Sequence, residues 1–150
     1  MSNLLTDTQR SLLEDVLDHI IPKEEDMPAA GQIAASYVES ASSTSAITIR
    51  VVLDMLALTA ATAGSLHSKS FSDIADSLKE PLLKIIEEQS PEMFSDFVTL
   101  VYNGYYTNAS VIKRLGPDAR IPQPTGFPIS PFNPAIVNNV RNLGPRYRAI

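Results

Sequence analysis

The sequence contains no cysteine and only two histidines, His19 and His67. The absence of cysteine excludes a disulfide framework and any thiolate metal site. The two histidines stand far apart in the chain, and neither lies beside a recognisable nucleophile or a second metal ligand. No catalytic, cofactor-binding or metal-binding residue is therefore predicted in this chain. We interpret His19 as a structural residue at a helix end and His67 as a solvent-facing loop residue.

An excess of positive charge is also missing, because the formal net charge is -5. This balance argues against nucleic acid as a partner. The N-terminal residues MSNLLTDTQR lack the basic region and apolar run of an export signal. A cytoplasmic location is expected as written, and a periplasmic one if a leader was removed or a partner carries the signal.

Long uncharged apolar runs are absent as well. The most apolar region, residues 46–63, contains Arg50 and Asp54. We interpret it as too short and too interrupted to span a bilayer, so no direct membrane insertion is expected.

Helical periodicity dominates the first 115 residues. A chain of 150 residues with 44% hydrophobic content suits one domain with its own core. Thr6 and Gln9 form a capping-box pattern, Pro22 ends the apolar stripe that follows, and Ser77 begins a second such pattern. The strand-like residues 47–52 run directly into helical spacing. An all-α fold of about six helices is predicted, with helices over residues 6–21, 28–38, 46–63, 77–86, 90–106 and 108–115 and a shorter helical segment over 71–75.

Three glycines are assigned roles by their positions in these patterns. Gly31 is expected to let another helix approach the second helix closely. Gly64 follows the third apolar stripe and is expected to end that helix at the C′ position. Gly104 is expected to loosen the central helix, because glycine weakens a helix by about 1 kcal/mol relative to alanine.

The central helix, residues 90–106, contains five of the ten aromatic residues of the chain. Ser90 suits the N-cap and Pro91 the first helical position. Tyr105 and Tyr106 are adjacent, so on a helix they point about 100° apart and do not enter the same core. One is expected to pack, and the other either to cap a crevice through its hydroxyl or to face a partner.

The composition changes from Gly116 onward, where seven of the eleven prolines lie. The segment cannot form helix or sheet over most of its length, apart from one short helix capped by Asn133. It is also basic, because Asp118 is the only acidic residue after Asp96. We predict a helical body over residues 1–115 and an extended, proline-rich, partner-binding tail over 116–150. The predicted apolar anchors of this tail are Ile121, Phe127, Ile129, Phe132 and Tyr147. A strap of this tail over its own core is the alternative.

Three blocks of the sequence resemble the gluconate 2-dehydrogenase subunit 3 family. They are DHIIPKEEDMPAAGQIAASYVES at residues 18–40, VYNGYY at 101–106, and the pair PQPTGFP at 122–128 and RNLGPRYR at 141–148. Each block alone is weak, because proline, glycine and tyrosine recur in many helical proteins. Together they stand in the order found in the family and span most of the chain.

The resemblance implies a small helical subunit without a cofactor of its own. Its expected partner is a large flavoprotein of the glucose-methanol-choline (GMC) oxidoreductase class, which holds FAD and oxidises an alcohol or sugar hydroxyl. Some such complexes include a cytochrome subunit. Family members often carry a twin-arginine signal that exports the folded flavoprotein with them, and this sequence departs from the family in showing none.

The function predicted on this basis is that of a non-catalytic subunit that binds and stabilises the flavoprotein, with the tail wrapping it. A helical adaptor or self-associating protein without a redox partner is an alternative, and an independent enzyme using His19 or His67 is a weaker one. Partner contacts are predicted at Tyr105, Tyr106, Pro122, Gln123, Pro124, Phe127, Pro128, Arg141, Arg146, Tyr147 and Arg148.

Overall fold

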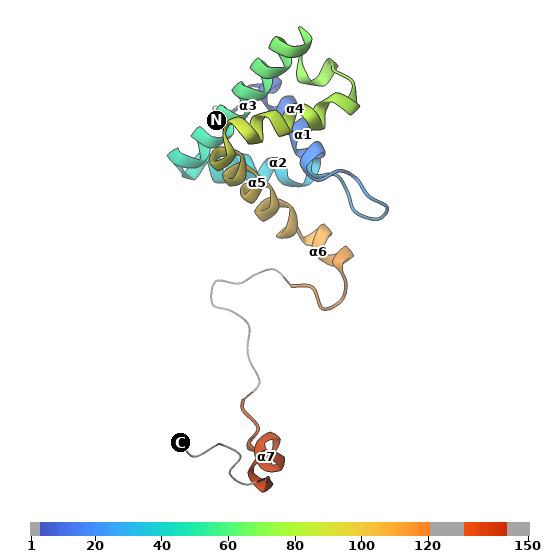
Figure 1. Cartoon of the computed structure of the whole chain (residues 1–150), viewed down its shortest axis with the longest axis vertical. Helices are drawn as coiled ribbons and strands as arrows, with labels where there is room; N and C mark the ends of the chain where they lie inside the picture. The colour runs from blue at the N-terminus through green and yellow to red at the C-terminus, as the bar shows by residue number, and fades with distance from the viewer. Residues whose placement is uncertain (1–3, 121–130, 144–150) are drawn as a thin grey trace, which may run out of the picture.

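The computed structural model describes residues 4–120 and 131–143, and within these ranges it contains helices and no strand. The predicted all-α fold is confirmed. Six helices make up the body, and a shorter pair follows in the tail (Figure 1). The elements are α1 (Asp7–Ile20), α2 (Ala30–Thr44), α3 (Ala46–His67), the 3-10 turn η1 (Phe71–Asp73), α4 (Asp76–Gln89), α5 (Pro91–Tyr106), α6 (Ala109–Leu115), the 3-10 turn η2 (Pro134–Val137) and α7 (Asn138–Asn142).

The start of α1 is fixed by the predicted capping box. The hydroxyl oxygen of Thr6 accepts the backbone N–H of Gln9 at 3.2 Å, and the Gln9 side chain accepts the backbone N–H of Thr6 at 2.9 Å. Two N–H groups that lack a partner within the helix are satisfied in this way. The helix ends at Ile20, as the position of Pro22 predicts.

The third helix is longer than its sequence pattern predicts. α3 runs through Gly64 to His67 and ends at Ser68, which adopts the left-handed conformation with φ 53°. The assignment of Gly64 as the C′ residue is therefore wrong, and His67 lies in the last turn of a helix rather than in a loop. The serine amide closes the helix by donating to the Gly64 carbonyl at 3.0 Å.

The length of α3 also corrects the expectation about a membrane span. Its 22 residues include an 18-residue window of mean hydropathy 1.6, which is long and apolar enough to cross a bilayer by length and composition. The buried residues Val52, Met55, Leu56 and Ala63 pack one side of the helix into the body. Of that window 28% is buried in the body, so most of this apolar helix is not buried within the residues that the structure describes.

Two further expectations about helix starts are corrected. α4 begins at Asp76 behind Ala75, which offers no capping side chain, so Ser77 lies inside the first turn and forms no capping box. α5 begins at Pro91 as predicted, yet the Ser90 side chain makes no capping hydrogen bond. The N-terminus of α5 was therefore predicted correctly from the positions of Ser90 and Pro91. The prediction of a second capping box at Ser77 is wrong.

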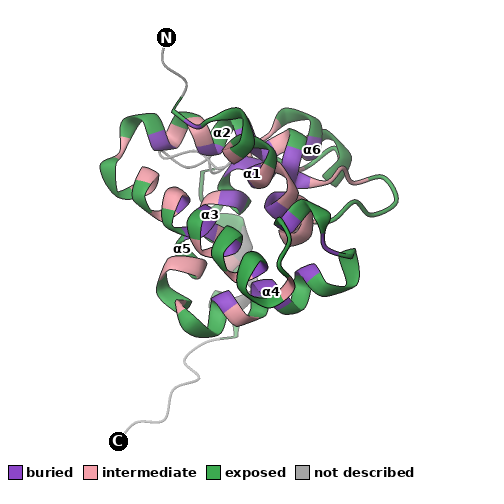
Figure 2. Cartoon of the chain, turned by 90° about the horizontal axis from the view of Figure 1, so that it is seen from above, coloured by how far each residue is buried: buried purple, intermediate pink, exposed green. Residues whose placement is uncertain are grey.

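The core forms where α1, α2, α3 and α5 meet. α2 packs against α1, α3 and α5, whereas α4 packs against α3 and α5. Figure 2 shows the buried residues on the inward faces of these helices and the exposed ones around them. The largest fully buried side chains are Tyr105, Phe71, Phe97, Leu13, Leu17, Met55, Leu82 and Ile86.

The described part of the tail contains the predicted short helical segment. The Asn133 side chain accepts the backbone N–H of Ala135 at 3.0 Å and so caps η2, which leads into α7. Phe132, predicted as an apolar anchor, is 71% exposed in this chain. The other predicted anchors, Ile121, Phe127, Ile129 and Tyr147, lie outside the described residues.

Candidate functional site

The loop between α1 and α2, residues 22–28, is fastened to the end of α5. The Tyr105 hydroxyl donates to the backbone carbonyl of Pro28 at 2.6 Å, and the tyrosine side chain is 1% exposed. Burial is the main cause that raises the pKa of Tyr105, and the nearby Tyr106 adds to the effect. Tyr105 is therefore the member of the tyrosine pair that packs into the core, with a satisfied hydroxyl, and its role as a partner contact stays a prediction.

The loop itself is closed by backbone hydrogen bonds. Glu24 and Met27 exchange N–H···O bonds of 3.1 and 2.5 Å, and Ala30 donates to the Ile21 carbonyl at 3.0 Å. Glu25 adopts a positive φ of 28° at the tip, a conformation that turns the chain sharply. The acidic loop is thus a defined turn, and the side chains of Glu24, Glu25 and Asp26 are exposed.

Two glycines allow the helices around this loop to approach closely. A Cβ on Gly31 would lie 2.6 Å from Asp18 Oδ1 and 2.7 Å from the Glu14 backbone oxygen. The Gly31 N–H donates to the same Asp18 oxygen at 2.5 Å, so α1 supplies the cap that Ala29 cannot. The predicted close approach at Gly31 is confirmed, and sequence reasoning missed Asp18 as its partner.

Gly104 has a similar role on α5. The helix continues through it to Tyr106, so the expected loosening is wrong. A Cβ at this position would lie 2.9 Å from Cδ1 and 3.1 Å from Cβ of Tyr37 on α2. The glycine therefore lets α2 and α5 pack at short distance.

A hollow of about 210 Å³ lies between the acidic loop and the end of α5. All of its lining residues come from the blocks at 18–40 and 101–106. They are Ile20, Ile21, Pro22, Glu24, Met27, Tyr102, Tyr105 and Tyr106. Two of the three blocks on which the family resemblance rests therefore meet in space and build one surface.

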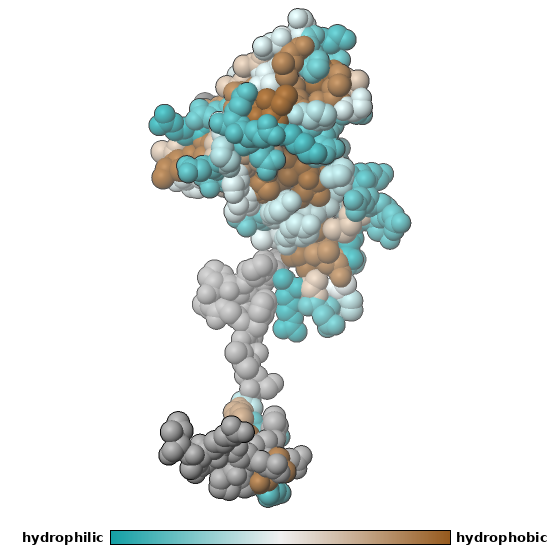
Figure 3. Space-filling model, viewed as in Figure 1, coloured by the Kyte–Doolittle hydropathy of each residue, from teal (hydrophilic) through white to brown (hydrophobic). Residues whose placement is uncertain are grey.

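A second hollow of about 410 Å³ adjoins the first and shares Ile20 and Tyr102 with it. It lies between the end of α1, α4 and α5, where Leu83, Phe94 and Val98 add apolar side chains. Figure 3 shows hydrophobic residues on this side of the body bordered by hydrophilic ones. We call the two adjoining hollows the tyrosine groove.

Tyr102 and Tyr106 are the exposed aromatic residues of the tyrosine groove. Their side chains are 46% and 44% exposed, and their rings meet edge to face at 5.9 Å between centroids. The ring of Tyr106 also meets that of the buried Tyr105 at 5.1 Å, with an interplanar angle of 85°. The three rings thus form a continuous series of contacts from the core to the surface. Sequence reasoning identified Tyr106 and missed Tyr102, although both lie in one stretch one helical turn apart.

The rim of the groove carries charge. Lys84 Nζ lies 2.8 Å from Glu80 Oε1, and this hydrogen bond lowers the pKa of Glu80 and raises that of Lys84. Glu87 lines the same hollow, and Glu24 lines the other. Carboxylates therefore outnumber lysines among the lining residues.

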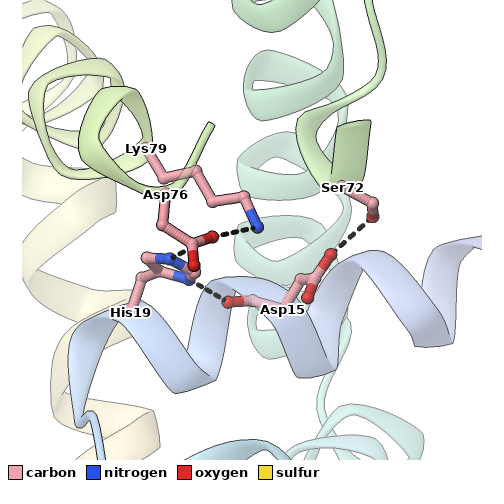
Figure 4. Close-up of polar contacts among 5 residues, drawn as sticks. All are labelled: Asp15, His19, Ser72, Asp76 and Lys79. Atoms are coloured by element: carbon pink, nitrogen blue, oxygen red, sulfur yellow. Dashed lines mark hydrogen bonds and ion pairs between the residues drawn. The ribbon is translucent and has the colours of Figure 1, made fainter. Parts of the chain in front are cut away.

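His19 lines the larger hollow of the groove and belongs to a polar cluster (Figure 4). Its Nδ1 lies 2.8 Å from the Asp15 backbone oxygen, and its Nε2 lies 3.9 Å from Asp76 Oδ1. Asp76 also pairs with Lys79 at 3.1 Å, while the Ser72 hydroxyl donates to the Asp15 carboxylate at 2.5 Å. The serine therefore bonds a carboxylate and not the imidazole, so the cluster lacks the geometry of an activated nucleophile.

The cluster instead joins three elements of the fold. The His19 ring meets the buried Phe71 ring edge on at 5.8 Å, and Lys79 Nζ lies 5.4 Å from the centroid of the same ring. Lys79 is 5% exposed, with its stem inside the body and its ammonium group paired with Asp76. His19 is thus a structural residue, as predicted. Among the residues that the structure describes, no group of three His, Cys, Asp or Glu side chains is arranged to hold a metal ion.

The remaining predicted contacts divide by their place in the chain. Arg141 lies on α7 and is exposed. Pro122, Gln123, Pro124, Phe127, Pro128, Arg146, Tyr147 and Arg148 lie outside the described residues. Their role as partner contacts stays a prediction.

Residues 7–117 match the family model of gluconate 2-dehydrogenase subunit 3, which covers the whole helical body from α1 to α6. The chain belongs to the gluconate 2-dehydrogenase subunit 3 family. The blocks at residues 122–128 and 141–148 lie beyond the matched range. No curated protein and no solved structure matches the chain.

Membership in the gluconate 2-dehydrogenase subunit 3 family indicates the kind of role that this helical body has. The family is named as a subunit of a dehydrogenase, which implies an accessory role beside a partner chain. The tyrosine groove lies within the matched residues, and so do both blocks that line its smaller hollow. The surface and the family assignment therefore concern the same part of the molecule.

Proposed function

We propose that this protein is the non-catalytic subunit of an FAD-dependent oxidoreductase complex, in which it binds and stabilises a large GMC-type flavoprotein acting on a sugar or alcohol hydroxyl. The observation that carries the proposal is the family match over residues 7–117. In this complex the partner holds FAD and performs the oxidation, and a cytochrome subunit is a further candidate member.

The geometry of the body supports a binding role rather than chemistry of its own. The one histidine of the polar cluster is fixed by a backbone carbonyl and lies beside a paired aspartate. The exposed aromatic residues instead line an open groove, where they are available to another protein. Exposed tyrosines are among the residue types that contribute most to protein interfaces.

The tail supplies a second part of the proposed interface. It is basic and rich in proline, whereas the body carries almost all of the acidic residues. Proline reduces the conformational entropy that a segment loses on docking. We infer that the tail wraps the flavoprotein while the body lies against it.

Co-expression with a GMC-type flavoprotein from the same genome tests the proposal. The expected result is a yellow complex of one large and one small subunit by size-exclusion chromatography with light scattering. The flavoprotein expressed alone is expected to be less soluble and to unfold at a lower temperature, because binding stabilises the folded state. A flavoprotein that is equally stable alone and ignores this chain would contradict the proposal.

Removal of residues 116–150 tests the role of the tail separately. The described core lies between Leu5 and Val111, so the shortened chain keeps its core residues. The truncated protein is expected to bind the flavoprotein more weakly than the full chain. Equal affinity would show that the tail does not contribute to the complex.

A helical adaptor that self-associates through its tails is the second candidate, since Phe132 and Leu143 are exposed in the single chain. Light scattering of the isolated chain distinguishes the self-associating adaptor from the accessory subunit. A stable dimer whose mass does not change on dilution favours self-association, whereas a monomer favours the accessory subunit.

A further inference from the structure

We propose that the tyrosine groove is the surface on which the flavoprotein docks, and that it takes an extended apolar segment of that partner carrying a lysine or arginine. This inference rests on the proposed function and assigns the partner a place on the body. It concerns the described helices and not the tail.

The chemistry of the groove suits an apolar chain with some rigidity. Tyr102 and Tyr106 expose nearly half of their side chains, and their rings, inclined at 72° to each other, present both a face and an edge. Grooves lined by aromatic rings bind extended proline-containing segments, whose preformed conformation limits the entropy cost of binding. The hydroxyl groups at the ring tips can bond the backbone of such a segment.

The shape of the groove favours an extended occupant over a single side chain. Hollows of about 410 and 210 Å³ adjoin through Ile20 and Tyr102, so the site is elongated along α5. One anchoring side chain would fill part of one hollow and leave the other in contact with water. A segment that crosses Tyr102 would place side chains in both.

The charges of the groove select for a cation on the partner. Glu80 and Glu87 line one hollow and Glu24 the other, whereas Lys84 is the one lysine among the lining residues. That lysine is already bonded to Glu80 at 2.8 Å. A lysine or arginine in the bound segment would complement this arrangement and exclude acidic segments.

The position of the groove agrees with the path of the chain. Arg114 on α6 donates to the backbone carbonyl of Asp26, so α6 is fastened to the loop that borders the groove. The chain leaves the body directly after α6, at Gly116. A tail that wraps the partner from this point places that partner against the face formed by the loop, α6 and the end of α5.

The test compares the full chain with a variant that carries both Tyr102→Ala and Tyr106→Ala. The affinity of each for the purified flavoprotein is measured by titration calorimetry. The loss of both rings is expected to raise Kd at least about tenfold, as for aromatic residues at the centre of an interface. Tyr37→Ala is the matched control, since Tyr37 is 40% exposed and does not line the groove, and its Kd is expected to stay within about threefold.

The outcomes separate this inference from the proposed function. If the unchanged chain binds and the double variant binds equally well, the groove is not the docking surface although the complex exists. If the unchanged chain does not bind, both proposals fail. If the double variant converts a dimer of the free chain to a monomer without weakening the complex, the groove is occupied by a second copy, which also overturns the inference. Circular dichroism and the denaturation midpoint confirm that the variant is folded.

Discussion

The outward faces of α5 and α3 differ although both helices are strongly apolar. The outward residues of α5 line the tyrosine groove with two exposed rings held by a buried third. The outward side of α3 exposes Ile47 and Leu66, and the two hollows beside it have no aromatic lining residue. Both faces thus expose apolar area, but the exposed aromatic side chains, a residue type enriched at protein interfaces, lie on the α5 face.

The glycines show the same contrast at the level of packing. Gly31 and Gly104, which flank the junction of α1, α2 and α5, have no room for a Cβ. Gly64 on α3 has open space around it, because no atom lies within 4 Å of the point that a Cβ would occupy. The packing where α1, α2 and α5 meet therefore leaves no space for a larger residue at Gly31 or Gly104, whereas Gly64 of α3 has that space.

Gly31→Ala is expected to have the largest effect on stability. The new methyl group would meet the Glu14 backbone oxygen, which cannot move without shifting α1. We expect a loss of about 3 kcal/mol in the free energy of unfolding, measured by urea denaturation. A loss below about 0.5 kcal/mol would show that the α1–α2 contact is not tight, and the contrast with α3 would disappear.

Tyr105→Phe is expected to cost about 1–2 kcal/mol at neutral pH, because the Pro28 carbonyl loses its donor. Burial raises the pKa of Tyr105, so the stability from its neutral form is complete below about pH 10 and is lost as the pH rises through the higher folded value. The difference between the two proteins in urea denaturation should therefore shrink above pH 10. Tyr102→Phe, at an exposed position, is the control and should change stability little. A difference that stays constant up to strongly alkaline pH would contradict the assigned hydrogen bond.

Gly104→Ala is expected to destabilise the protein by about 1 kcal/mol. The methyl group would press against Tyr37, whose side chain is 40% exposed and can move aside at some cost. The gain in helix propensity offsets part of this loss. Thermal denaturation shows whether the substitution lowers or raises the stability. An increase in stability would mean that α2 and α5 do not approach as closely as described.

Gly64→Ala is expected to act in the opposite direction and to be the smallest change. With open space for the methyl group, only the helix propensity changes, which should stabilise the protein by up to about 1 kcal/mol. Denaturation in urea alongside the two other glycine variants provides the comparison. Destabilisation here would show that α3 bends or frays at Gly64.

Local signals in the sequence predicted much of this fold. The capping box at Thr6, the proline at the start of α5 and the Asn133 cap all involve neighbours within a few residues, so the pattern itself contains the interaction. The separation of the adjacent tyrosines also followed from helix geometry, although it did not reveal which of them is buried. These features depend on contacts along one helix.

The groove and the roles of two glycines depend on distant neighbours, and here the pattern was insufficient. Gly104 looked like a weak point because propensity alone considers its own helix, whereas Tyr37 on α2 determines its role. Ile20 and Tyr102 come together only when α1 and α5 both pack against α2. The family blocks were recognised as sequence, but their meeting in one surface required the fold.

The comparison of α5 with α3 is tested most directly by hydroxyl-radical footprinting of the chain, free and in complex with the flavoprotein. The method reports the solvent access of individual side chains. We expect oxidation of Tyr102 and Tyr106 to fall sharply in the complex, while oxidation of Ile47 and Leu66 on α3 stays unchanged. Protection of Ile47 and Leu66 with no change at the two tyrosines would contradict the account, because the partner would then lie on the face of α3.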